Sequence, residues 1–110
     1  MKIALLNCLK ANEVCAGAAC LRAFNNRLKH FEQYKDQDLE LVAMARCNGC
    51  EAGIDEGFKE KLDRIAEIGA EVCHVGVCTV RRDTGNECPV ITEALKYLEE
   101  RGVRPYRGTH

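Results

Sequence analysis

The stretch Leu39-Glu40-Leu41-Val42-Ala43-Met44-Ala45 runs directly into Arg46-Cys47-Asn48-Gly49-Cys50. The first part is a short apolar run, which predicts a buried strand. The second part places two thiols three positions apart at the end of that strand, and Gly49 allows the backbone to turn so that both point inward. A Cys-x-x-Cys pair serves either as half of a tetrahedral thiolate metal site or as a dithiol that cycles to a disulfide.

The composition is that of an ordinary globular domain with an unusual number of thiols. The 110 residues, 46% hydrophobic and 30% charged, predict a single domain over residues 1–110. A formal net charge of −1 argues against a nucleic-acid or anionic-membrane partner, and no apolar stretch is long enough to cross a bilayer. Residues 1–8 predict a strand rather than a secretion signal, so we expect a cytoplasmic protein with reduced thiols. Eight cysteines then favour metal binding or thiol chemistry over a disulfide framework.

The periodicity of the apolar residues predicts strands that alternate with helices along the whole chain. Strands are expected at 2–6, 39–45, 71–77 and 103–106. Helices are expected on the stripe Leu21, Phe24, Leu28 and Phe31, between Asp55 and Gly69, and from Cys88-Pro89 to Gly102. This order predicts an α/β three-layer sandwich with a four-stranded parallel sheet in the order 2-1-3-4, flavodoxin-like or Rossmann-like. Ligands of such sheets bind at the edge formed by the carboxyl ends of the strands.

This topology brings cysteines from distant parts of the chain to that one edge. Cys8 follows the first strand, Cys47 and Cys50 follow the second, and Cys78 follows the third. We therefore expect these four thiols to be the core ligands of a metal site. Further side chains are expected at the same edge, as additional ligands or supporting groups: Cys15, Cys88 and His110, with Cys20 nearby.

Two residues of the third strand are expected to lie away from this edge. Cys73 comes early in the strand, where a free cysteine acts as a small buried hydrophobe. His74 points to the other face, and about 13 Å of strand separates it from Cys78. A hydrogen-bonded core histidine is therefore favoured for His74, while a supporting role at the metal site is the alternative.

The ordered set of these residues resembles the CGGC-domain family of small cysteine-rich proteins. The set comprises Cys8, Cys15, Cys47-x-Gly49-Cys50, His74-x-x-x-Cys78, Cys88-Pro89 and Gly108-Thr109-His110. The chain departs from the namesake motif at Asn48, where the family has Gly. The resemblance implies a small α/β fold and a metal site, and it implies no particular reaction.

Three interpretations of the thiols stay open at this point. Four thiolates suit a zinc ion and an iron–sulfur cluster equally in ligand type. The alternative is a metal-independent thiol–disulfide oxidoreductase in which Cys47 or Cys50 is the nucleophile and the other resolves the mixed disulfide. The third is a purely structural or partner-binding domain, whose metal, if any, only stabilises the loops. The expected partners are a metal ion and a protein or redox partner.

Overall fold

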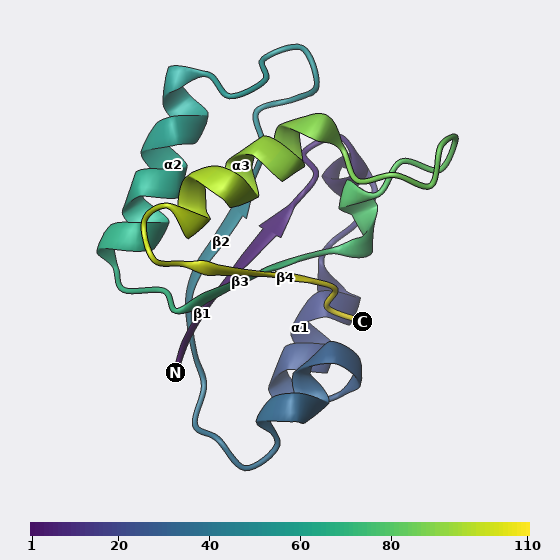
Figure 1. Ribbon diagram of the computed structural model, residues 1–110. Coiled ribbons are helices and arrows are strands. Elements are labelled where there is room, and N and C mark those ends of the chain that lie inside the picture. Colours follow the sequence, from purple (N-terminus) through teal and green to yellow (C-terminus); the bar gives the residue numbers. More distant parts are fainter.

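A four-stranded parallel sheet in the order β2-β1-β3-β4 forms the centre of the molecule (Figure 1). The computed structural model describes all residues from Met1 to His110. Its elements, with η for 3-10 helices, are β1 (Lys2–Asn7), η1 (Ala11–Glu13), α1 (Ala18–Asn26), η2 (Lys29–Tyr34), β2 (Glu40–Arg46), α2 (Glu56–Glu67), β3 (Val72–Val75), η3 (Val77–Thr79), α3 (Pro89–Glu99) and β4 (Arg104–Arg107). The predicted strand order is confirmed.

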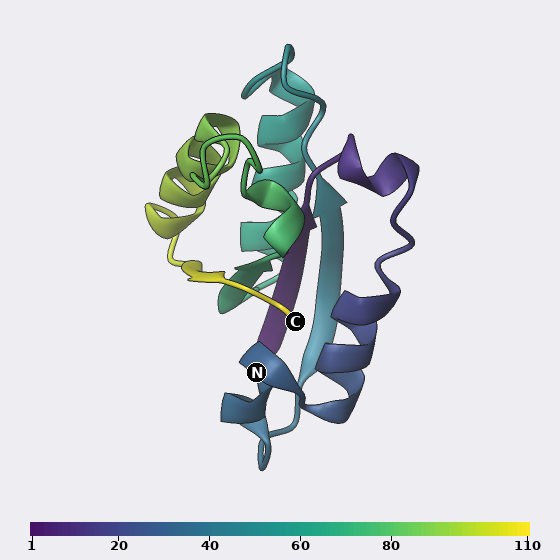
Figure 2. The ribbon, with the colours of Figure 1, turned by 90° about the vertical axis from the view of Figure 1, so that its right-hand side faces the viewer.

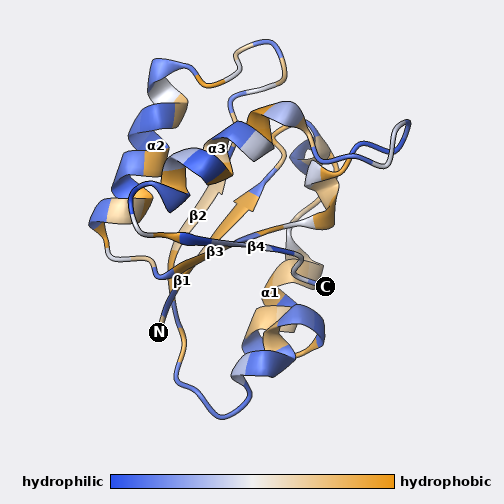
Figure 3. Cartoon of the chain, viewed as in Figure 1, coloured by the Kyte–Doolittle hydropathy of each residue, from blue (hydrophilic) through white to orange (hydrophobic).

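The strand β1 lies inside the sheet and is apolar on both faces. Ile3 and Leu5 pack with α1 and η2, whereas Ala4 and Leu6 pack with α2 and α3. Figure 2 shows α1 and α3 on opposite sides of β1 and β2. Figure 3 shows hydrophobic colour along β1 and hydrophilic colour on outward parts of α2 and α3. The three-layer α/β sandwich is therefore confirmed.

Local sequence signals set the ends of α2 and α3. The Asp55 carboxylate caps α2 by accepting the Phe58 N–H at 2.8 Å, and Gly69 follows the helix with a left-handed φ of +89°. Pro89 is the first residue of α3 and Cys88 is its N-cap. These signals were all recognised in the sequence. None of the helices has both the length and the apolar character needed to cross a membrane.

The first helix is shorter than the apolar stripe predicted, and this part of the prediction is wrong. The helix α1 ends at Asn26, Arg27 takes a left-handed φ of 54°, and Phe31 lies on the separate helix η2. The Arg27 guanidinium donates to the Phe24 carbonyl at 2.6 Å, in addition to the Arg27 backbone N–H at 3.4 Å, and so holds the end of the helix. Two short helices, α1 and η2, therefore take the place of the single helix that the apolar residues predicted.

The strand β3 is also shorter than predicted, because it ends at Val75 rather than at residue 77. Gly76 leads into η3, and a Cβ at this position would collide with the side-chain oxygen of Asn7. Cys78 therefore lies on η3, just beyond the sheet. The strands β2 and β4 begin and end one residue later than predicted.

Candidate metal centre

The carboxyl ends of β1, β2 and β3 meet because the three strands are parallel neighbours. Asn7, the last residue of β1, is buried at their meeting point. Its backbone carbonyl accepts the N–H of Cys47 at 3.2 Å, and its side-chain oxygen lies 3.8 Å from the Cys78 sulfur. Asn7 thus contacts the first residue after β2 and the segment after β3.

Two thiols from different strand ends accept hydrogen bonds from adjoining backbone N–H groups. The Cys78 Sγ accepts the N–H of Cys8 at 3.4 Å, and the Cys47 Sγ accepts the N–H of Leu9 at 3.4 Å. Because Cys8 and Leu9 are consecutive, these bonds bring Cys47 and Cys78 to the same short piece of backbone as Cys8. At Cys78 this hydrogen bond favours the thiolate form of the acceptor. Three of the four predicted core ligands therefore lie around the end of β1.

The electrostatics of Cys78 identify further thiols at this edge. Burial raises the pKa of the Cys78 thiol, and the N–H of Cys8 acts in the opposite direction. The neighbouring thiols of Cys8, Cys20 and Cys15 raise the pKa of Cys78 further. Several thiolates at one place repel each other, and a bound cation would compensate that repulsion.

Cys20 has a buried contact that sequence reasoning missed. It is the third residue of α1, and its Sγ lies 3.1 Å from the hydroxyl of Thr109. The contact joins residues 89 positions apart and holds the end of the chain against α1. The sequence carries no signal for this pairing, because only the folded sheet brings the end of β4 to α1.

The remaining predicted ligands are more open to solvent. Cys15 and Cys50 are exposed, and the Cys15 Sγ accepts the N–H of Gly17 at 3.4 Å. Cys88 is partly buried at the start of α3, and His110 is exposed. Their role as ligands stays a prediction.

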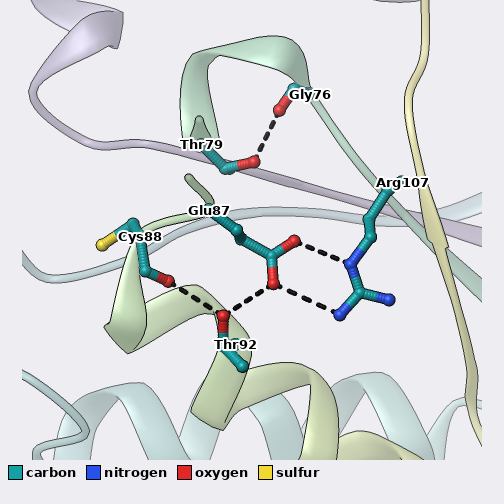
Figure 4. A network of polar contacts seen from close by, with 6 residues as sticks. All are labelled: Gly76, Thr79, Glu87, Cys88, Thr92 and Arg107. Carbon is teal, nitrogen blue, oxygen red and sulfur yellow. Dashed lines mark hydrogen bonds and ion pairs between the residues drawn. The ribbon is translucent and has the colours of Figure 1, made fainter. Parts of the chain in front are cut away.

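A polar network fixes the start of α3 (Figure 4). Glu87 accepts two hydrogen bonds from Arg107, at 2.9 and 3.2 Å, and one from the Thr92 hydroxyl at 2.7 Å. The N–H of Cys88 donates to the Thr79 carbonyl at 2.8 Å. The network ties α3 to β4 and η3, and the Cys88 sulfur points away from the Glu87 carboxylate (Figure 4).

Cys73 lies inside the sheet, as the sequence predicted. It is fully buried between β1 and β4 among the apolar residues that face α2 and α3. Burial raises the pKa of its thiol to about 12. Cys73 is therefore a neutral packing residue.

His74 is a hydrogen-bonded core histidine, as favoured from the sequence. Its Nε2 lies 2.9 Å from the Tyr34 hydroxyl, and its Nδ1 lies 2.8 Å from the Gly108 carbonyl. The ring stacks on Phe31 and Tyr106, with centroid distances of 4.4 and 4.7 Å. Burial lowers the pKa of His74. Both ring nitrogens have partners inside the protein, so neither is free to bind a metal ion.

The thiols at the edge are neighbours without forming a preassembled site. No group of three or more His, Cys, Asp or Glu side chains is arranged in a way that could hold a metal ion. All eight cysteines are free, and their sulfur atoms are the donors that soft metal ions prefer. The residues therefore fit such a metal in kind, and side-chain rotation would be needed to close them around it.

Comparison with known proteins identifies the family. A profile of the CGGC domain matches residues 2–110. The chain belongs to the CGGC domain family. This CGGC domain is 36% identical, over 118 aligned positions, to an uncharacterized protein of Methanocaldococcus jannaschii, and the alignment covers 100% of the chain and 87% of that protein. No solved structure matches the CGGC domain. The resemblance predicted from the ordered cysteine set is confirmed.

Proposed function

We propose that this CGGC domain binds a soft metal, either a zinc ion or an iron–sulfur cluster, at the carboxyl edge of its sheet. The core ligands are Cys8, Cys47, Cys50 and Cys78. The observation that carries the proposal is the pair of N–H···S hydrogen bonds from Cys8 and Leu9, because it places the sulfurs of Cys47 and Cys78, from two strand ends, at the backbone that carries Cys8 at a third.

The chemistry of the donors supports a soft metal. Every proposed core ligand is a cysteine, and zinc and iron–sulfur clusters both bind four cysteine thiolates. Backbone N–H groups that donate to the sulfurs stabilise the negative charge on a metal-bound thiolate. Cys15, Cys88 and His110 are available as additional ligands at the same edge.

Elemental analysis of anaerobically purified protein tests the proposal. We expect stoichiometric zinc in a colourless protein, or iron and sulfide in a brown one. The variant Cys47→Ser should lose most of that metal while its far-ultraviolet circular dichroism stays that of the folded sheet. Wild-type protein without metal, or unchanged metal in Cys47→Ser, would contradict the assignment.

A second candidate function is the reduction of disulfides without metal, and the unequal exposure of the Cys-x-x-Cys pair favours it. Cys50 is exposed, whereas Cys47 is buried beside it in sequence. The Cys50 thiolate would attack a substrate disulfide, form a mixed disulfide and release one substrate thiolate. Cys47 would then attack Cys50, release the second substrate thiol and close the Cys47–Cys50 disulfide. Two electrons pass to the substrate, and an external dithiol returns the protein to its reduced state.

These two functions give different results with one protein sample. Metal-free protein that reduces a model disulfide in the presence of dithiothreitol, with loss of the reaction in Cys50→Ser, supports the oxidoreductase. Metal-free protein without this reaction, together with stoichiometric metal in the purified form, supports the metal site.

A further inference from the structure

The loop that carries Cys50 makes no backbone hydrogen bond to the rest of the protein. None of the 64 backbone–backbone hydrogen bonds involves residues 48–54. Gly49 and Gly53 take left-handed φ values of +105° and +58°, and a Cβ on either would meet nothing within 4 Å. The loop thus extends into open space, and its position depends on side-chain contacts.

Ile54 packs against the core at the far end of the loop, and the side chain of Asn48 supplies the polar contacts at its start. Its amide nitrogen donates to the Asp55 carboxylate at 2.9 Å, and its amide oxygen accepts from the Lys61 ammonium at 2.6 Å. The same ammonium donates to the Arg46 carbonyl at 2.8 Å, at the end of β2. Asn48 therefore joins the start of the loop to α2, while Lys61 joins α2 to the strand that precedes Cys47.

Gly57 and Asp55 form the surroundings of the Asn48 side-chain amide. A Cβ at Gly57 would lie 3.0 Å from the Asn48 amide nitrogen, so the glycine leaves the space that the side chain needs. Two hydrogen bonds hold the pKa of Asp55 below its usual range. The bond from the Phe58 N–H has the larger effect, and the bond from the Asn48 amide has the smaller one. Asp55 is thus a carboxylate at neutral pH and accepts both the helix N–H and the loop amide.

We propose that Asn48 and Lys61 are positioning residues that hold Cys50 beside Cys47 for metal binding, an inference that rests on the function proposed above. A ligand on a tethered loop loses less conformational freedom when it binds an ion than a ligand on a free loop. Hydrogen-bonding partners that orient metal ligands commonly contribute 10–100-fold to affinity.

The variants Asn48→Ala and Lys61→Met test this proposal, with Lys59→Met as the matched control on the same helix. Lys59 is exposed. In metal-free, reduced protein we expect the heteronuclear NOE of the amides of residues 49–53 to fall in both test variants and to stay unchanged in Lys59→Met. In a chelator competition with zinc ion, we expect about tenfold weaker binding in both test variants.

A conservative substitution separates positioning from general destabilisation. Lys61→Arg keeps a charged donor and should recover part of the zinc affinity that Lys61→Met loses. Unchanged NOE values in both test variants would overturn the proposal, and so would looser loops with unchanged zinc affinity. Wild-type protein that binds no zinc and no iron would instead overturn the proposed function, and the positioning role with it.

Discussion

Cys73 and Cys78 occupy the two environments that this sheet offers to a cysteine, its interior and its carboxyl edge. Cys73 is fully buried, and burial raises its pKa to about 12. Cys78 is partly buried, accepts the N–H of Cys8, and lies near the thiols of Cys8, Cys15 and Cys20. A short run of chain separates the two, with Gly76 between them. A thiol before the end of β3 therefore packs in the core, whereas a thiol beyond that end is available for chemistry.

The largest expected difference between the two cysteines is in metal affinity. Cys78→Ser should weaken zinc binding by more than about 100-fold, beyond the effect of losing a supporting hydrogen bond, because it removes a ligand. Cys73→Ala should leave the affinity unchanged. Competition titrations on both variants measure this, and similar losses in the two would contradict the distinction between interior and edge.

A smaller difference is expected in the stability of the metal-free protein, and here the substitution of Cys73 has the larger effect. Cys73→Ser places a hydroxyl in an apolar site without a partner, which should lower the free energy of unfolding by about 1–3 kcal/mol. Cys78→Ser changes a partly exposed residue and should cost clearly less. Urea denaturation measures both values. Equal destabilisation would mean that the edge is as closely packed as the interior.

The smallest expected effect is a pH dependence of folding stability, caused by the buried His74. Burial is the main cause that lowers the pKa of His74 in the folded protein, while an unfolded histidine titrates near about 6.5. Below that value the unfolded chain binds a proton that the folded one does not. Stability should therefore be constant above about pH 7 and fall as the pH decreases from about 6.5 toward the folded pKa.

Urea midpoints at about pH 8 and about pH 5.5 measure this dependence. In His74→Gln the decrease between the two conditions should be smaller, whereas His30→Gln removes only a lesser cause of the lowered His74 pKa and should keep most of it. Equal pH dependence in wild type and His74→Gln would show that the ring does not control it.

Much of this arrangement could be predicted from the sequence because it depends on local signals. The Asp55 cap, the Cys88-Pro89 helix start and the apolar strands each act over a few residues, and parallel topology then fixes the common edge. The strand ends carried Cys8, Cys47 and Cys78 to that edge as expected.

The features that sequence reasoning missed depend on contacts between distant residues. The break after α1 rests on a left-handed Arg27, a conformation that its side chain does not favour and that no local pattern indicates. The Cys20–Thr109 contact and the two partners of His74 join segments that only the sheet brings together. The role of Asn48 likewise required the position of Lys61 on α2.

The proposed metal centre requires that thiols from three strand ends meet around the end of β1. A short thiol-specific cross-linker such as dibromobimane, applied to the reduced, metal-free and folded protein and followed by peptide mass spectrometry, tests it most directly. We predict cross-links that join Cys78 to Cys8 or Cys47, and none that include the buried Cys73. Cross-links confined to the sequence neighbours Cys47 and Cys50, with Cys78 unlinked, would contradict the claim.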